Sequence, residues 1–538
     1  MAFSKAEAYE AGAYESEGHP QRWWILGFLC LSLVLIVASV SSVNVALPSI
    51  QRDLDASGSD LQWIVDSYAL FFAGMLLPLG AIGDYLGRRK VLIAGLLFFG
   101  LATGIAAAAE EAYQIIVMRA IMGTAAALIM PATLSILTEV FTKRELPKAI
   151  AVWAAFAGAG GMIGPIGAGL VLKWFWWGGV FALTIPLVLV GLFGAIFVVP
   201  SSRNGNGAHP FDPLGALLSI IIIGAFVFGV IEGPNYGWTN MAILGMFIIT
   251  ALAGILFYFW EKKVSHPMLD PNYFRIRRFN LSALAMTVMF FGLFGWLFVL
   301  TQYFQFAQGH SPLDAGLRMM PSAVVMLIVA PRSATIAAAW GTRKIVSRGL
   351  LLVSFGIGGL AFITPDTPYW IVVICLVVGA LGGSILMPTV TERIVSSLPS
   401  EKAGVGSAMN DTTREVGGSI GIAIVGSLLA VGYRRGVDGT VSDLTERLGQ
   451  AGGFVDSARD SIGRALAVSG ELANRGLGGE AGQLRDAAIV AFDSGMTLGL
   501  GITAGVVFLT SVIIWLFYPA DELEIAPKAA AEGDGRPR

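Results

Sequence analysis

The sequence has little charge, few histidines and almost no cysteine. Charged residues make up 13% of the 538 residues, against about 25% in average soluble proteins, so water could not solvate such a surface. The net charge of −2 offers no basic face for nucleic acid. Cys30 and Cys375 stand inside apolar runs, and the four histidines stand in tails or loops. This distribution argues against a disulfide framework, a metal site or a histidine proton relay.

The sequence has long apolar runs instead. Hydrophobic residues make up 55% of the chain, and a run of about 20 apolar residues can cross a bilayer as a helix. The 67 glycines suit helices that pack closely in lipid. We predict an all-α membrane protein with fourteen transmembrane helices, near residues 23–47, 61–82, 91–109, 113–138, 148–172, 177–199, 214–232, 240–260, 280–305, 315–338, 346–363, 369–391, 404–432 and 494–518.

Basic residues indicate the orientation of these helices. If the N-terminus is inside, the clusters at 88–90 and 262–263 fall in cytoplasmic loops, while the short outer loops hold Arg52 and Lys173. Cytoplasmic loops of membrane proteins carry the excess of lysine and arginine. We predict a multi-pass protein of the cell (inner or cytoplasmic) membrane with both termini in the cytoplasm.

One long polar segment, residues 433–493, separates the last two apolar runs. Val441, Leu444 and Leu448, and then Ile462 and Leu466, recur at helical spacing. We predict two amphipathic helices on the outer face. They form either a solvated cap with no binding role or a surface for a partner.

The loop after the second apolar run carries the clearest motif, which extends from Gly80 to the basic cluster at 88–90. Its glycines, including Gly87, allow a tight turn between two helices. Asp84 precedes Arg88 and Arg89, and a carboxylate in this setting favours arginine partners and the N-terminus of another helix. Such a cluster can hold two helical bundles together on one side of the membrane and release them when they rock apart.

Two further patterns follow in the fourth and fifth runs. Arg119 places a cation within the membrane, which costs at least about 2.5 kcal/mol unless it is paired or wetted. We expect Arg119 to face a cavity, and the alternative is a structural arginine that reaches the interface. Gly160, Gly164 and Gly169 form a face for close helix contact, and Pro165 removes a backbone donor and bends the helix.

These three motifs resemble those of the major facilitator superfamily. The loop at 80–90 resembles the signature GxLxDxxGRKxxL. The pattern around Arg119 resembles RxxQG, with Met122 in place of Gln, and residues 160–169 resemble the antiporter motif GxxxGPxxGG, with Ala168 as a departure. The order and positions of all three motifs agree with that family.

The fourteen runs, together with Trp63, Asp66 and Tyr68, narrow the resemblance to the fourteen-span drug:proton antiporters of the QacA and EmrB type. The resemblance implies two six-helix bundles with an inserted helix pair, and it implies that the turn near Gly404 and Gly406 receives Asp84. It divides the chain into a cytoplasmic tail (1–22), a first bundle (23–199), a linker with the inserted pair (200–277), a second bundle that includes the 433–493 loop (278–518) and a second cytoplasmic tail (519–538).

The first apolar run departs from the family in one position. The family's first helix usually reads LDxTxxNVALP, with the Asp facing the cavity. Here Ser39 occupies the position of that Asp, while Asn44 keeps the family's Asn. One expected cavity carboxylate is therefore missing, and cations should be attracted less strongly.

The coupling candidate in the second run is Asp66. A drug:proton antiporter needs a group that holds a proton and a substrate in turn, and a carboxylate in a low-dielectric cavity suits this, because burial favours its neutral form. The neighbouring Trp63 and Tyr68 could offer aromatic surface to a lipophilic cation.

The second coupling candidate is Asp411 in the thirteenth run. Glu415 lies on the same helix face, and Arg414 could neutralise one of the two acids. The alternative is a self-satisfied polar cluster near the helix entry, and the resemblance to QacA-type members favours a functional role.

Several other residues have a plainer interpretation. Glu232 ends the seventh run at the outer surface, and Glu139 closes the fourth at the cytoplasmic rim, so we interpret both as interfacial or capping residues. An aromatic stripe in the ninth run either packs against neighbouring helices or lines an apolar pocket; it comprises Phe294, Trp296, Tyr303 and Phe304.

The leading hypothesis is proton-driven export of amphipathic, cationic drugs or antiseptics by a monomer in the lipid bilayer. The proton gradient supplies the energy, so no cofactor is expected. The alternative is export of an endogenous lipid or secondary metabolite with weak cation selectivity. A minor alternative is a receptor or scaffold without transport. No nucleophile–base arrangement or phosphate loop supports an enzyme.

Overall fold

The computed structural model describes residues 18–56, 58–201, 212–398, 402–448 and 454–519. Within these ranges the chain is all-helical, with short 3-10 and π turns between or at the ends of α-helices. Most of the two predicted tails lies outside the described residues. The predicted apolar runs form helices because a segment in lipid must satisfy its backbone hydrogen bonds within itself.

The first half of the chain ends at a span that is interrupted. Its helices are α2 (Arg22–Leu54), α3 (Gly58–Leu86), α4 (Arg88–Ala107), α5 (Ala112–Val140), α6 (Leu146–Trp174), α7 (Gly178–Ala182) and α8 (Ile185–Phe197). The predicted run at 177–199 is divided between α7 and α8. Pro186 stands in the first turn of α8, where its missing N–H costs nothing.

Two inserted helices, α9 (Pro213–Tyr236) and α10 (Met241–Lys263), follow and pack against each other. Asp212 caps α9 by accepting a hydrogen bond from the Gly215 backbone N–H (2.9 Å). The same carboxylate accepts a hydrogen bond from the indole Nε1 of Trp260 on α10 (3.0 Å). One buried acid therefore fixes the start of α9 against the end of α10.

The second half contains the longest helices. It comprises η1 (Pro271–Arg275), α11 (Arg277–Gln302), η2 (Tyr303–Ala307), α12 (Pro312–Val329), η3 (Ala330–Arg332), α13 (Ser333–Trp340), α14 (Thr342–Leu360), α15 (Tyr369–Ser396), α16 (Ala403–Leu448), η6 (Val455–Arg459), α17 (Ile462–Asn474) and α18 (Gly478–Phe517). The predicted run at 315–338 is interrupted by the 3-10 turn η3, which contains Pro331.

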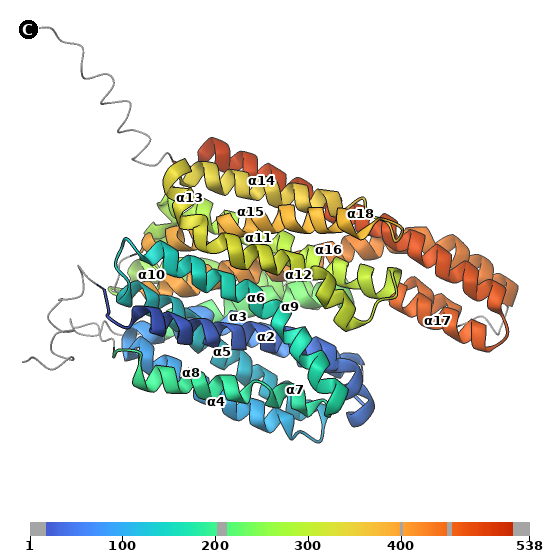
Figure 1. The fold of residues 1–538 in the computed structure, drawn as a ribbon, viewed down its shortest axis with the longest axis horizontal. Coiled ribbons are helices and arrows are strands. Elements are labelled where there is room, and N and C mark those ends of the chain that lie inside the picture. Colours follow the sequence, from blue (N-terminus) through green and yellow to red (C-terminus); the bar gives the residue numbers. More distant parts are fainter. Residues whose placement is uncertain (1–17, 57, 202–211, 399–401, 449–453, 520–538) are drawn as a thin grey trace, which may run out of the picture.

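Thirteen of the described helical stretches are long and apolar enough to cross a membrane, one fewer than predicted. The difference is α14, whose first turns carry Arg343, Lys344 and Arg348. Arg343 and Arg348 lie over the rings of Trp515 and Trp340 (5.4 and 5.0 Å to the ring centroids), an arrangement that suits basic residues near a membrane interface. Because α14 packs lengthwise against α15 and α18 (Figure 1), it is part of the helical bundle.

The helices form two groups that meet along a shared interface. In the first group α2 packs on α6 and α3 on α5; in the second, α11 and α18 pack on α16 and α14 packs on α15. Figure 1 shows α2, α4 and α8 along one side of the molecule and α14, α15 and α18 along the other. Contacts of α16 with α3 and α5, and of α6 with α12 and α15, join the groups, while α9 contacts both α3 and α16.

The predicted pair of separate amphipathic helices at 433–493 is wrong in its boundaries. The first is a continuation of α16, which has 46 residues and is therefore about 69 Å long, more than twice the thickness of a hydrocarbon core. The second corresponds to η6 and α17, and α18 begins as early as Gly478. Tyr433 donates a hydrogen bond to the Ala458 carbonyl (2.9 Å) and ties this cap together. Figure 1 shows α17 beyond the other helices, beside the extended ends of α16 and α18.

Candidate functional site

Asp84 joins the two groups of helices at the end of the molecule where α2 begins and α18 ends. Its carboxylate accepts hydrogen bonds from the backbone N–H groups of Gly404 (2.9 Å) and Val405 (3.1 Å) at the start of α16. The first N–H groups of a helix have no partner within the helix, and they carry the positive end of its dipole. The contact expected between Asp84 and the turn at Gly404 is therefore present.

The Arg88 side chain completes this terminal junction, which we define as Asp84, Arg88, Glu139 and the first turn of α16. Arg88 is 3.3 Å from Asp84 and 2.6 Å from Glu139 on α5, and it donates to the Ser135 carbonyl (3.2 Å). The interpretation of Glu139 as a plain rim or capping residue was incomplete, because Glu139 is an ion-pair partner of Arg88.

The residues next to this junction hold its geometry. Gly87 adopts φ 99° between α3 and α4, a conformation that L side chains rarely reach. Arg89 donates to the Ala195 carbonyl (3.0 Å) and to the Ile196 carbonyl at the end of α8. Burial lowers the pKa of the Lys402 ammonium, just before α16, below its usual value.

Gly80 and Gly404 allow α3 and α16 to touch. A Cβ on Gly80 would lie 2.6 Å from the Ala408 Cβ and 2.8 Å from the Gly404 carbonyl oxygen, and a Cβ on Gly404 would overlap Asp84. Real Cβ atoms essentially never come so close. The two glycines therefore bring Asp84 within hydrogen-bonding distance of the helix end.

The glycine face predicted in α6 packs against α2. A Cβ on Gly160 would lie 3.0 Å from Val37, and one on Gly164 would overlap the Ala38 carbonyl and the Ser41 hydroxyl. Pro165 follows within a continuous helix. Gly169 faces Leu313 of α12 at ordinary van der Waals distance, so α6 contacts both groups of helices.

Arg119 is fully buried, with 0% of its surface exposed. Its Nε donates to the Ile64 carbonyl on α3 (2.9 Å), and its guanidinium lies 4.3 Å from the centroid of the Tyr68 ring. Nη1 and Nη2 of Arg119 and the hydroxyl of Tyr68 have no hydrogen-bond partner among the described residues. A buried cation in this state is costly, which makes the site a candidate for function rather than for stability.

Asp411 on α16 is buried as well, with 1% exposed. Its Oδ1 accepts hydrogen bonds from the Asn410 amide (3.1 Å) and from Arg414 (3.4 Å), while its Oδ2 has no partner in the described part of the chain. The Arg414 guanidinium lies over Phe290 of α11 (4.7 Å) and Trp153 of α6 (5.9 Å). The predicted alternative of a self-satisfied cluster therefore does not describe Asp411 fully.

Glu415 connects the residues around Arg119 with those around Asp411. It interacts electrostatically with Arg414 and Asp411 on its own helix, and with the Tyr68 hydroxyl of the other group of helices. We call Tyr68, Arg119, Asp411, Arg414 and Glu415 the central cluster. It combines two predicted sites that are distant in sequence.

Asp66 does not belong to the central cluster. It is half-buried, accepts a hydrogen bond from the Gln62 side chain and lies near the carboxylate of Glu232 on α9. Glu232 stands near the end of its span, as predicted, but the side chain is only 4% exposed, so its interpretation as an interfacial or capping residue is incomplete. Trp63 and Phe228 contact each other at the same interface (6.2 Å between ring centroids).

The helical register explains how Asp66 and Glu232 meet. A Cβ on Gly74 of α3 would lie 3.9 Å from the Gly224 Cα of α9. Asp66 is eight residues before Gly74, and Glu232 is eight residues after Gly224. In antiparallel helices both lie about 12 Å along the axis from the glycine contact. The sequence could not place Glu232 here, because it does not give the neighbour of α9.

The remaining predicted residues have simpler surroundings. Ser39 is buried in α2, and Asn44 is exposed. The aromatic stripe of α11 and η2 is largely core, which favours the packing interpretation: Tyr303 and Phe304 are fully buried, and Tyr303 donates to the Thr364 carbonyl (2.8 Å).

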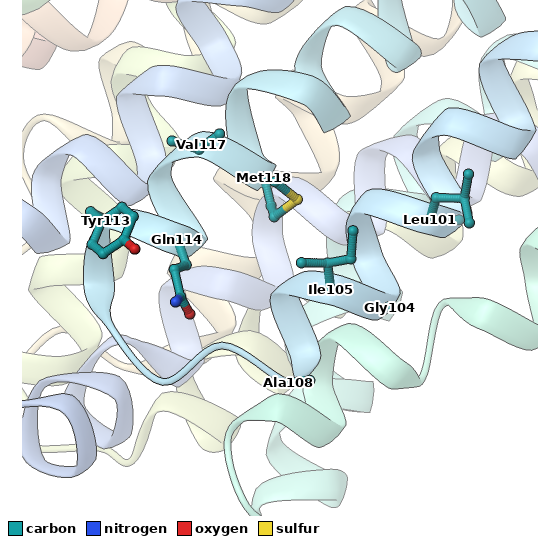
Figure 2. A pocket seen from close by; sticks show the side chains of 9 residues that line it. Leu101, Gly104, Ile105, Ala108, Tyr113, Gln114, Val117 and Met118 are labelled. Carbon is teal, nitrogen blue, oxygen red and sulfur yellow. The ribbon is translucent and has the colours of Figure 1, made fainter.

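An apolar hollow of about 680 Å³ lies where α4 and α5 approach their connecting loop. Figure 2 shows Leu101 and Ile105 on one helix and Tyr113 and Val117 on the next. These four side chains are each more than 45% exposed. None of the predicted site residues lines this hollow, and such a surface suits lipid rather than the central cluster.

Comparison with known proteins gives a consistent result. The Major Facilitator Superfamily matches residues 29–213 and 211–422. The multidrug efflux pump LfrA of Mycolicibacterium smegmatis is 33% identical over 92% of this chain and 96% of its own. The methyl viologen resistance protein SmvA of Salmonella typhimurium is 30% identical over 92% of this chain and 98% of its own. The structure of the human organic anion transporter MFSD10, 11% identical, has a TM-score of 0.60 and covers 92% of this chain and 100% of its own, which shows the shared fold.

Proposed function

Because the chain belongs to the Major Facilitator Superfamily, we propose that it is a multidrug efflux transporter that exports amphipathic drugs in exchange for protons. The chain is a multi-pass membrane protein and not an enzyme, and the expected kinship with fourteen-span drug exporters is confirmed. The names of LfrA and SmvA describe multidrug efflux and methyl viologen resistance. These names support drugs, cations among them, as the substrate class.

The observation that carries the proton coupling is the incomplete pairing of the central cluster. Asp411 and Arg119 are buried where the two groups of helices meet, and each has polar atoms without a partner in the described residues. A buried carboxylate with a free oxygen can hold a proton, and it can instead attract a cation. Exchange of the two at one site is the chemistry that an antiporter needs.

The terminal junction serves as the gate in this proposal. The groups of helices correspond to bundles at 23–199 and 278–518, with the pair at 200–277 inserted between them. With the termini in the cytoplasm, Asp84 holds the cytoplasmic side closed through the first turn of α16. Rocking of the bundles breaks these bonds and opens the cytoplasmic side of the site. One monomer in the cell membrane contains every part of this cycle.

A second candidate is export of an endogenous lipid or secondary metabolite. Ser39 is buried in α2, and α2 has no carboxylate between Arg22 and Arg52. With one acid fewer than the family pattern implies, the site should discriminate less strongly in favour of cations. A neutral lipophile would then be the better substrate.

Reconstituted vesicles with an imposed pH gradient test these proposals. Ethidium (a monocation), methyl viologen (a dication) and a neutral lipophile are compared for uptake into inside-out vesicles, with and without a protonophore. Gradient-dependent uptake of the cations supports drug antiport, and uptake of the neutral compound alone supports the second candidate. Uptake of none of them, with no substrate-dependent proton release, leaves the non-transporting scaffold.

A further inference from the structure

Arg119 has no counter-charge in its own bundle. No acidic side chain forms an ion pair with it in the described ranges, and the only charge interaction that it makes there is with Tyr68. A guanidinium with two free Nη groups at 0% exposure is unstable without a negative group nearby. The adjacent α2 cannot supply that group, because Ser39 and its neighbours in the membrane carry no carboxylate.

Tyr68 lies between Arg119 and an acid of the other bundle. One face of its ring carries the guanidinium (4.3 Å to the centroid), and its hydroxyl interacts electrostatically with Glu415 on α16. The hydroxyl is buried and has no hydrogen-bond partner in the described residues. The register of α3 against α16 places the two groups at the same level. Gly80 of α3 touches Gly404 of α16, Tyr68 is twelve residues before Gly80, and Glu415 is eleven residues after Gly404. In antiparallel helices both therefore lie about 17 Å along the axis from this glycine contact.

We propose that Tyr68 is a positioning residue which links Glu415 to Arg119, so that the C-terminal bundle supplies the counter-charge that α2 lacks. When Glu415 is ionised, the Tyr68 hydroxyl donates a hydrogen bond to it, and the arginine on the ring is neutralised across the interface. When Glu415 takes up a proton, the link is lost and the bundles separate more easily. This inference rests on the proposed antiport and assigns a role to Tyr68 and Glu415 within it.

The charges of the cluster agree with this role. Arg119 and Arg414 supply two positive charges, and Asp411 and Glu415 supply two negative charges. Phe290 of α11 and Trp153 of α6 complete the surroundings without charge, and Glu232 of α9 faces Asp66 instead. Protonation of Glu415 changes the cluster from neutral to +1, which repels a bound cation and favours its release.

The test is Tyr68→Phe in reconstituted vesicles, with ethidium export measured from pH 5.5 to 8.5. Loss of the donor disfavours ionised Glu415, so the half-maximal pH of export should move upward by about one unit, since one hydrogen bond to a charged group is worth ~1.5 kcal/mol. The matched control is Tyr433→Phe, which removes another buried tyrosine hydroxyl, bonded to Ala458 in the cap. It should leave the pH profile unchanged.

Glu415→Gln tests the partner. In that background Tyr68→Phe should produce no further shift of the pH profile. A shift that persists without Glu415, or a Tyr68→Phe profile equal to the wild-type one, overturns the inference.

A readout without transport separates this inference from the proposed function. The melting temperature of the purified protein is followed against pH for the same four variants and wild type. If no substrate is exported by wild type, the antiport proposal fails, yet the link still requires Tyr68→Phe alone to change the pH dependence of melting. Identical pH dependence in Tyr68→Phe and Tyr433→Phe overturns the link even if export is proton-driven.

Discussion

The terminal junction and the central cluster both connect the two groups of helices through charged side chains, but they differ in how completely those side chains are paired. At the terminal junction the Asp84 carboxylate has Arg88 and two helix N–H groups, and Arg88 also has Glu139. In the central cluster Arg119, Tyr68 and Asp411 each keep at least one buried atom without a hydrogen-bond partner in the described residues.

This difference in pairing separates a site that stabilises one conformation from a site that exchanges protons and substrate. A buried charge with a full set of partners stabilises one arrangement, and removal of one partner is costly. A buried polar atom without a hydrogen-bond partner costs free energy in this conformation. A protein retains such an atom where a ligand, a proton or a conformational change supplies the partner in another state. We therefore expect the terminal junction to determine which side is closed and the central cluster to determine what is exchanged.

The largest expected effect is that of Asp411→Asn. It removes a buried carboxylate that has a free oxygen, so gradient-driven ethidium export should fall by about 100-fold, within the range for loss of a proton-transferring group. Exchange of labelled for unlabelled substrate should continue, because this exchange needs no net movement of protons. The control is Asp438→Asn on the same helix, which affects only an ion pair with Arg459 in the cap. Equal loss of exchange and of driven export would make Asp411 a structural residue.

Asp84→Asn tests the holding role. Asparagine keeps one acceptor but loses the charge that Arg88 and the start of α16 require, so the closed state should weaken by about 2 kcal/mol. The expected result is a lower melting temperature together with slower export. Glu145→Gln removes a partly exposed ion pair with Arg22 at the same end of the molecule and should change little. An unchanged melting temperature in Asp84→Asn would contradict the claim that the terminal junction stabilises the closed state.

Three alanine substitutions in α6 test how much the close packing of α6 against α2 stabilises the protein. Gly164→Ala overlaps the α2 backbone and should destabilise the protein by about 1.5 kcal/mol. Gly160→Ala meets Val37 at 3.0 Å and should cost less, while Gly161→Ala has its nearest atom at 3.8 Å and serves as the control. Thermal unfolding and export are measured for all three. Equal melting temperatures and equal export in all three variants would show that α2 and α6 adjust freely to the added volume.

Glu232→Gln tests the acid pair with Asp66. Removal of one of two neighbouring carboxylates should weaken export of the dication methyl viologen by about fivefold, or ~1 kcal/mol. The monocation ethidium should be affected less, because Asp66 alone can balance one charge. Competition between the two compounds in the same vesicles gives the ratio directly. The same loss for both would assign Glu232 to folding instead.

The smallest effect is expected at the cap. Glu471 on α17 pairs with Arg475, the residue that follows this helix, and about half of each side chain is exposed. Glu471→Gln should change stability by less than about 0.5 kcal/mol and should not alter export. A clear loss of export would show that the cap takes part in transport and is not only a solvated cover.

The sequence predicted the parts of the terminal junction well. Gly80, Asp84, Gly87 and Arg88 lie within nine residues of one another, and the glycine spacing and charge of the loop are local properties. The acceptor turn at Gly404 came from the family resemblance rather than from any local signal.

The sequence could not predict that Asp66 and Glu232 lie close together. Glu232 was interpreted as an outer residue because it stands near the end of an apolar run, where interfacial acids are common. Its burial depends on α9 packing against α3 through Gly74 and Gly224, and no local pattern in either helix specifies its partner helix.

By itself the sequence determined that this chain is a bundle of membrane helices with a glycine-lined α6 and a charged loop after α3. Hydrophobic length and small-residue spacing act within one segment, so they can be read without a structure. Only the tertiary structure decided that Glu415 of one bundle lies near Tyr68 and Arg119 of the other, that Glu232 is buried beside Asp66 and that α16 continues into the cap. Each of these depends on which surfaces meet across hundreds of residues, and a buried charge acquires its partners only when those surfaces come together.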